Sequence, residues 1–176
     1  MEQKIALLWF MCFMLNHLNA IQPPPQPEIL EDAVIKSNAI IDHEVIIIGR
    51  CLITSDVTFS ENGHIVIYPG STLKLKGYPQ SIILRNLKKN SIIFSDDTSW
   101  LVISPQGRVT LKFIEKPEYS IGTLVVSIEA TLRLVSPWTA FKNFFSPTFK
   151  FEIRRDGRIF RDLPSKQKTL YTLPKQ

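Results

Sequence analysis

The chain has 176 residues, a formal net charge of +5 and only 2 cysteines. This length provides one domain with a substantial hydrophobic core and excludes two domains of ordinary size. The sequence has no metal-spaced set of cysteines, no phosphate-binding glycine loop and no motif for a serine or cysteine nucleophile. It therefore names no reaction.

Residues 1–20 have the layout of a secretory signal peptide. Lys4 supplies a positive charge, an apolar run from Ile5 to Leu15 follows, and the segment ends with the small residue Ala20. As a helix the run covers about 16 Å, which is shorter than the roughly 30 Å of a bilayer core. We therefore expect cleavage after Ala20 and an exported protein, either extracellular or periplasmic. The alternative is an uncleaved anchor.

Export would leave Cys51 as the single cysteine of the mature chain, because Cys12 lies in the predicted signal peptide. Without an intramolecular disulfide, stability has to come from burial. Apolar neighbours predict that Cys51 is a core residue, and a reactive or intermolecular thiol is the alternative.

The next two segments predict a spacer and a helix. Residues 21–27 are rich in proline and predict an extended spacer. Residues 28–37 carry acids in the first turn and apolar side chains at helical spacing: Ile29, Leu30, Ala33 and Val34. This pattern predicts a short amphipathic helix.

From Asp42 to Ser136 the pattern is that of short strands. Apolar triplets recur at intervals of about twenty residues, each followed by a second short strand; the triplets centre on Ile46, Val66, Ile83, Val102 and Val125. In Leu73-Lys74-Leu75-Lys76 the leucines must share one face and the lysines the other. We predict an all-β fold, a parallel β-solenoid of about five rungs, in which each rung buries its apolar face against its neighbours. An antiparallel β-sandwich is the alternative.

The stretch from Ile65 to Gly77, IVIYPGSTLKLKG, resembles the rungs of right-handed parallel β-helices of the pectin-lyase-like kind. The resemblance extends from Asp42 to Ser136. It implies that the segment 28–37 is an N-terminal cap, and it suggests a carbohydrate-active lyase or hydrolase as one possible function. Five rungs are few for the enzymes of that superfamily.

The C-terminal part is aromatic and basic. The stretch FKFEIRRDGRIFRDLP predicts a β-hairpin with its turn at Asp156-Gly157. Phenylalanines of this region are expected to cover the last rung: Phe141, Phe144, Phe145, Phe149, Phe151 and Phe160. We take residues 28–163 as the domain and residues 164–176 as a basic tail.

Two groups of residues are candidates for chemistry. His43 and His64 lie about one rung apart beside Glu44 and Glu61, which could form a metal site, although solvated histidines are the simpler interpretation. Asp96 and Asp97 follow a short strand, and the family resemblance makes them candidate carboxylates with Lys112 as a base. Turn formation is the simpler explanation of adjacent acids. We therefore predict neither a cofactor nor a metal, and no enzymatic activity.

The positive charge is the stronger functional signal. From Pro137 onward, 9 Lys or Arg oppose 3 acids, a net charge of +6. If the rungs stack evenly, Lys74, Lys112 and Arg133 share one outward position and form a ladder. The hairpin adds Arg154, Arg155, Arg158 and Arg161. We expect an exported binding protein that holds an anionic partner, an acidic glycan or lipid head groups before nucleic acid. A structural protein that packs against other chains is the remaining alternative.

Overall fold

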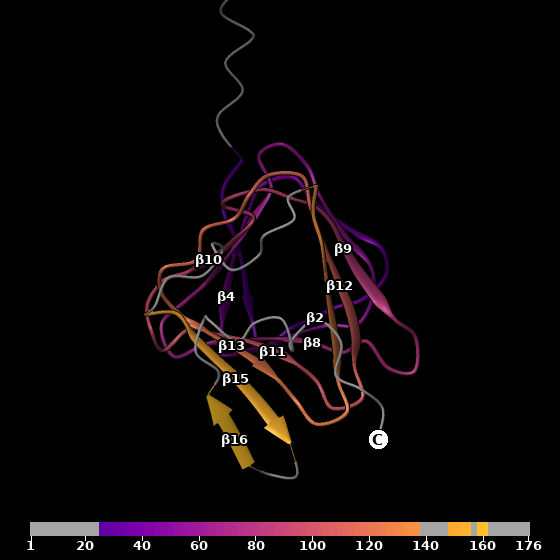
Figure 1. Cartoon of the computed structure of the whole chain (residues 1–176). Helices are drawn as coiled ribbons and strands as arrows, with labels where there is room; N and C mark the ends of the chain where they lie inside the picture. The colour runs from indigo at the N-terminus through magenta and orange to yellow at the C-terminus, as the bar shows by residue number, and fades with distance from the viewer. Residues whose placement is uncertain (1–24, 138–147, 156–157, 162–176) are drawn as a thin grey trace, which may run out of the picture.

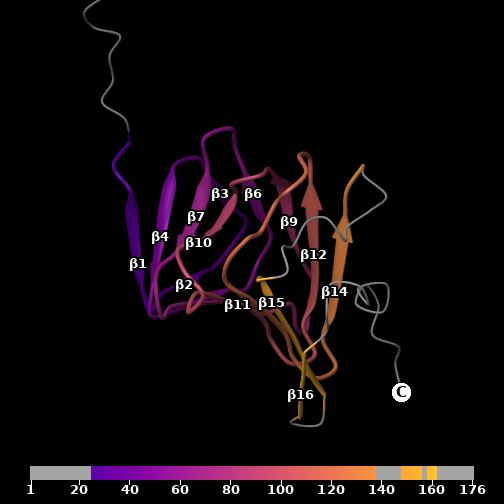
Figure 2. The same ribbon diagram turned by 60° about the vertical axis from the view of Figure 1, so that its left-hand side comes forward.

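The computed structural model describes residues 25–137, 148–155 and 158–161, and these contain strands but no helix. The predicted signal peptide and the basic tail lie outside them. The fold is a coil of short strands that winds through three sheets, and successive rungs stack along the coil (Figures 1 and 2). Among the described residues, no helix is long and apolar enough to cross a membrane.

Each of the first four rungs gives one strand to each sheet. The first rung is β1 (Glu28–Glu31), β2 (Val34–Ile35) and β3 (Ala39–Ile41), and the second is β4 (Glu44–Ile48), β5 (Arg50–Ile53) and β6 (Val57–Phe59). The third is β7 (His64–Ile67), β8 (Thr72–Leu75) and β9 (Ile82–Leu87), and the fourth is β10 (Ile92–Phe94), β11 (Trp100–Ile103) and β12 (Arg108–Phe113). A fifth rung contains β13 (Thr123–Val126) and β14 (Thr131–Val135), and β15 (Lys150–Arg155) and β16 (Arg158–Arg161) follow.

The rungs form sheet A (β1-β4-β7-β10), sheet B (β2-β5-β8-β11-β13-β15-β16) and sheet C (β3-β6-β9-β12-β14). All neighbours pair in parallel except β15 and β16, which pair antiparallel. Parallel pairing of strands from successive rungs is the arrangement of a β-solenoid with about five rungs, and it excludes the antiparallel sandwich.

Alternation along each strand separates the core from the surface. Leu73 and Leu75 are fully buried, whereas Lys74 and Lys76 between and after them are exposed. The inward residues stack in register from rung to rung, as in the ladder Cys51–Leu73–Leu101–Leu124 of sheet B. Because of this stacking, the core is continuous along the coil. Each fully buried aliphatic side chain contributes about 1.5–3 kcal/mol to the stability of the fold.

The predicted N-terminal cap helix is wrong, because Glu28–Glu31 and Val34–Ile35 are strands of the first rung. Between them Asp32, with a φ of 46°, turns the chain at a corner, and its Oδ1 accepts a hydrogen bond from Arg50 N at 2.7 Å. Two short strands separated by a corner place apolar residues at intervals that resemble helical spacing. The first rung is thus part of the coil.

The expected stacking of the apolar triplets is also wrong in part. Val66 lies in sheet A opposite Ile46, whereas Val102 and Val125 pair with each other in sheet B. Ile83 lies in sheet C. A rung contains three strands, one for each sheet, so successive triplets belong to different sheets.

The C-terminal strands pair as a hairpin should, with Glu152 opposite Arg161 and Arg155 opposite Arg158. The predicted turn at Asp156-Gly157 lies outside the described residues. Of the expected aromatic cover, Phe149 is buried, and its ring centroid lies 5.3 Å from that of Phe94 and 5.7 Å from that of Tyr119. These rings cover the last strand of sheet A. Phe141, Phe144 and Phe145 are outside the described residues, as are the side chains of Phe151 and Phe160.

Candidate anion-binding face

The cations predicted to form one ladder lie on two different sheets. Lys74 is on β8 of sheet B, opposite Leu52 and Val102. Lys112 and Arg133 are on β12 and β14 of sheet C. Arg154 and Arg155 belong to β15, and Arg158 and Arg161 belong to β16, all in sheet B. The side chains of these four arginines are outside the described part of the structure.

Lys112 and Arg133 are not opposite each other either. Arg133 pairs with Thr110, and Lys112 pairs with Val135. The prediction that the two charges are direct neighbours is therefore wrong. The observed register between β12 and β14 differs from the predicted one by two residues. A shift of two keeps both side chains on the outer face, because side-chain direction repeats every second residue.

The outer surface of sheet C nevertheless gathers cations, and we call Arg85, Arg108, Lys112 and Arg133 the basic face. Arg108 and Lys112 are four residues apart on β12, about 13 Å along the strand. Because Arg133 lies opposite Thr110, midway between them, its Cα is about 8 Å from that of each. Arg108, Lys112 and Arg133 are all exposed.

The charges of the basic face are only partly neutralised. Arg85 on β9 forms an ion pair with Asp56, with 2.8 Å between Nη2 and Oδ2, and Asp56 Oδ1 also accepts a hydrogen bond from Ile83 N. Among the described residues, Arg108, Lys112 and Arg133 take part in no ion pair. The strands of sheet C contain no Asp or Glu. Three positive charges therefore remain uncompensated on this surface.

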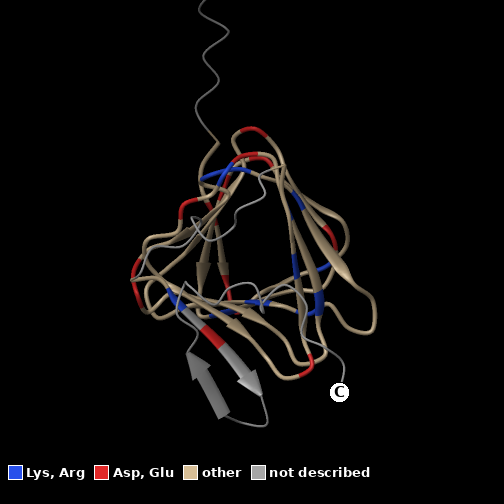
Figure 3. Ribbon diagram, in the orientation of Figure 1, with Lys and Arg blue, Asp and Glu red and all other residues tan. Residues whose placement is uncertain are grey.

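The acids lie mainly elsewhere on the coil. Glu28, Glu31 and Glu44 belong to sheet A. Glu115 follows β12 at one end of the basic face, and Glu129 precedes β14 at the other, where its Oε2 accepts a hydrogen bond from Gln106 Nε2 at 3.0 Å. In Figure 3 several positive positions lie on the strands of sheet C, to the right, others lie on sheet B and at the top corner, and most negative positions lie at corners. The basic face is thus bordered by acids but not crossed by them.

Sequence analysis missed Arg85 and Arg108. The signal for Arg108 was readable, because Arg108, Thr110 and Lys112 alternate with apolar residues in one strand, and only Lys112 of these three was singled out. The signal for Arg85 was weaker, because the regular alternation of side chains is interrupted next to it. At the left-handed residue Asn86 the register between β9 and β12 shifts, between Leu111 and Phe113 of β12.

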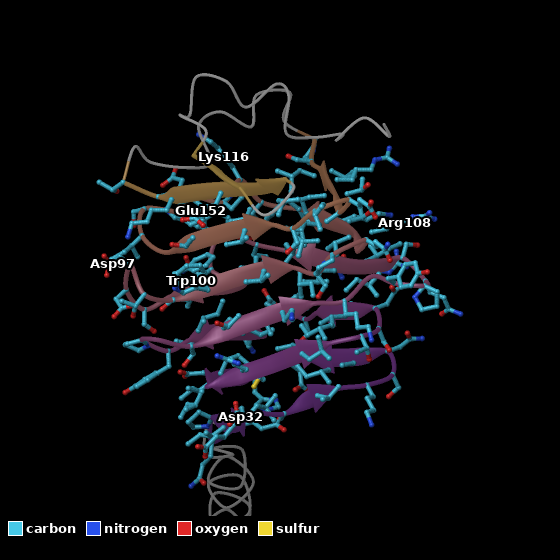
Figure 4. The ribbon with its side chains drawn as sticks, turned by 90° about the horizontal axis from the view of Figure 1, so that it is seen from below. Asp32, Asp97, Trp100, Arg108, Lys116 and Glu152 are labelled. Atoms are coloured by element: carbon cyan, nitrogen blue, oxygen red, sulfur yellow. The ribbon has the colours of Figure 1, made fainter. Side chains whose placement is uncertain are left out.

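The carboxylates considered for catalysis do not meet a base. Asp96 Oδ1 accepts hydrogen bonds from Thr98 N at 2.8 Å and Thr98 Oγ1 at 2.7 Å, which lower the pKa of the Asp96 carboxyl and form a turn. Asp97 pairs with Lys150 at 3.5 Å. Both lie at the corner between sheets A and B, whereas Lys112 is on sheet C; Asp97 and Arg108 lie at opposite edges of the coil in Figure 4. The structure does not bring the expected acid–base set together.

The two histidines lie at the corner between sheets C and A, where Glu44 pairs with His64 in the strand register. His43 Nδ1 lies 2.6 Å from Asp42 Oδ1, and His43 Nε2 lies 3.3 Å from Glu28 Oε2. His64 Nε2 is 3.8 Å from Glu44 Oε2. In the part of the chain that the structure describes, no three His, Cys, Asp or Glu side chains are arranged to hold a metal ion.

His43 should make stability depend on pH. Its hydrogen bond to Asp42 raises the pKa of the imidazole above the ordinary value of about 6.5. A group whose folded-state pKa is raised stabilises the fold fully below its unfolded pKa, and this contribution is lost as the pH rises through the folded pKa. We expect the free energy of unfolding to fall from about pH 6.5 upward, and a His43→Gln variant to lack this slope. An NMR titration in which His43 Hε1 shifts with a midpoint below 6.5 would contradict this prediction.

Cys51 is a core residue, as predicted. Its side chain is 1% exposed, and Sγ donates a hydrogen bond to Leu30 O at 3.2 Å. Burial raises the pKa of the thiol, so little thiolate forms near neutral pH. The folded protein therefore offers no reactive thiol at this position.

Comparison with known proteins returned no relative. No family model matches the chain, and no curated protein and no solved structure matches it significantly.

Proposed function

We propose that this chain is an exported, non-enzymatic β-solenoid that binds a linear acidic glycan across the basic face of sheet C. The observation that carries the proposal is the group of three exposed and unpaired cations, Arg108, Lys112 and Arg133, on a sheet whose strands contain no Asp or Glu. Export follows from the signal-like residues 1–20 and is part of the proposal. Secretion would bring the protein to the compartment where acidic glycans are found.

The electrostatics of this triangle favour a polyanion. Two unit charges about 8 Å apart repel by about 0.5 kcal/mol in water, and by about 2 kcal/mol at an effective dielectric constant of 20. A polymer that carries sulfates or carboxylates would replace this repulsion with attraction and release its own counterions. Thr110 and Thr131 lie between the cations on the outer face and provide hydroxyl groups for hydrogen bonds to sugars.

Exposed cations on strands have a simpler role, since they keep sheet edges from pairing with other molecules. That role fits Arg133, because β14 is the last strand of sheet C. It does not fit Arg108 and Lys112, because β12 lies between β9 and β14 with both of its edges paired. The two cations of β12 therefore support binding over edge protection.

The first test is the salt dependence of binding to a sulfated polysaccharide. Counterion release predicts that the logarithm of the association constant falls linearly with the logarithm of the salt concentration, with a slope of about −1 for each cation engaged. Three engaged cations give a slope near −3. Titration calorimetry with heparin at several NaCl concentrations measures it. Affinity that does not change with salt, or the absence of binding at low salt, would contradict the proposal.

A further inference from the structure

Among the residues that the structure describes, none covers the N-terminal end of the coil. The strands β1, β2 and β3 are the end strands of sheets A, B and C, and each pairs on one side only among the described residues (Figure 2). Each carries one exposed aliphatic side chain: Ile29 is 60% exposed, Val34 is 44% exposed and Ile40 is 69% exposed. Natural sheet edges usually carry charges or proline at such positions.

The interior of the first rung is also incompletely covered. Of its inward side chains Ile41 is buried, whereas Leu30, Ala33, Ile35 and Ala39 contact the core but are only partly buried. The corresponding residues of the second rung, such as Ile47, Ile53 and Val57, are fully buried. A layer of polypeptide on the open end would bury this apolar surface.

The backbone of β3 is prepared for such a layer. Ala39 N donates to Asp56 O, and Ile41 O accepts from Ser60 N, so both residues direct their backbone groups toward β6. Because these directions alternate along a strand, the N–H and C=O of Ile40 point to the open side. In β2, Ala33 and Ile35 bond to β5, which leaves the backbone groups of Val34 pointing outward in the same way.

We propose that a second copy of this chain covers the open end, with a twofold axis through Ile40 of the two β3 strands. Antiparallel pairing of β3 with its copy then makes Ile40 and Ile40 of the partner a hydrogen-bonded pair that exchanges both backbone bonds. The same axis places β1 of each copy against β2 of the other, because it exchanges sheets A and B.

Charge selects this axis among the three that the triangular coil permits. A twofold through β1 would oppose Glu28 and Glu31 to the same two acids of the copy. A twofold through Val34 of β2 would place Lys36 opposite Asp32 of the copy, but Asp32 is already held by Arg50 N, and the same axis would set acidic β1 against β3, which carries no cation. The axis through β3 instead brings acidic β1 against the partner's segment that contains Lys36. In the register in which Ile29 faces Lys36 of the partner and Glu31 faces Val34 of the partner, Glu31 lies diagonal to that Lys36.

This dimer would join the outer faces of the two C sheets. Arg85 is two strands away from the axis strand β3, so the two copies of Arg85 would be separated by five strand spacings, about 24 Å. An anionic polymer could then extend from one basic face to the other. The dimer itself does not depend on the proposed function.

The test uses cysteine cross-linking of the full chain. In the proposed dimer the two Ile40 Cα atoms are about 5.5 Å apart, which is within the range for a disulfide. We expect Ile40→Cys to form a disulfide-linked dimer on oxidation and Val34→Cys to form no intermolecular disulfide, because each Val34 faces β1 of the partner. The unchanged protein, in which Cys51 is buried, gives the background.

Sedimentation equilibrium completes the experiment. The unchanged protein should dimerise, Ile40→Lys should be monomeric with an unaltered circular dichroism spectrum, and Ile114→Lys, a change of another exposed isoleucine, should still dimerise. Glu31→Lys should weaken the dimer, and Lys36→Glu in the same chain should restore it.

A monomer at all concentrations, as expected if residues 1–24 or another protein cover this end, overturns the inference. Equal cross-linking through Val34→Cys does so too. Loss of heparin binding with an intact dimer affects only the proposed function.

Discussion

Replacing Gly63 with alanine should prevent stable folding. A Cβ at this position would lie 1.7 Å from Ile41 O and 2.5 Å from Ile41 C, both of them backbone atoms. Ile41 O is held by hydrogen bonds from Ser60 N and Ser60 Oγ, and Ile41 belongs to β3, so the backbone cannot move aside without separating two rungs. The expected loss of stability is at least about 4–5 kcal/mol, the upper end for single substitutions, out of a total of about 5–15 kcal/mol.

Gly70→Ala is the matched control for this prediction. Gly70 has a φ of 70°, but a Cβ there would meet no atom within 4 Å. It should lose only the roughly 1–2 kcal/mol of a left-handed alanine. Urea unfolding followed by circular dichroism compares the two variants, and soluble yield serves if Gly63→Ala does not fold. Equal stability of Gly63→Ala and Gly70→Ala would contradict the close approach of Gly63 to Ile41 of β3.

Reversing the three unpaired charges of the basic face should abolish glycan binding. The variant Arg108→Glu, Lys112→Glu, Arg133→Glu replaces attraction with repulsion at each position. At about 1 kcal/mol for each cation, loss of the three contacts weakens binding by roughly 3 kcal/mol, which is about 100-fold, and the new negative charges add to this. The fold should be unaffected because all three side chains are exposed.

A second triple variant controls for net charge. Arg50, Lys74 and Lys76 are exposed on the sheet B side of the coil, and changing them to glutamate lowers the formal charge by the same amount, from +5 to −1. If the site is on sheet C, this variant should lose much less affinity for heparin than the sheet C variant. Equal losses in calorimetry would show that only the overall charge matters and would contradict binding at the basic face.

Local alternation was the part of the structure that the sequence revealed most reliably. The pattern Leu73-Lys74-Leu75-Lys76 predicted two buried leucines and two exposed lysines, as the structure confirms. It also allowed the solenoid to be predicted, because short alternating strands with turns between them can bury their faces by stacking.

The assignment of strands to sheets could not be predicted, because the rungs differ in length. Ile46 pairs with Val66 twenty residues later, whereas Val66 pairs with Ile93 twenty-seven residues later. Corners absorb these differences without a sequence signal, so a strand of three to six residues does not show which face of the coil it occupies. The ladder of Lys74, Lys112 and Arg133 failed for this reason, while the concentration of cations on outward positions did not depend on it.

The first rung was mispredicted because its local sequence pattern is that of a helix. Ile29, Leu30, Ala33 and Val34 have helical spacing, and nothing local reveals that a corner at Asp32 separates two strands. Pairing with β4 and β5 decides the outcome, and these strands follow later in the chain.

A map of the bound surface by NMR tests whether sheet C binds the glycan. Titrating a short sulfated oligosaccharide into the isotope-labelled protein should shift the amide signals of β9, β12 and β14, with the largest changes near Arg108, Lys112 and Arg133. Signals of sheets A and B should move little. Shifts concentrated on sheet B or in the C-terminal residues, with those of β12 unchanged, would contradict the assignment of binding to sheet C.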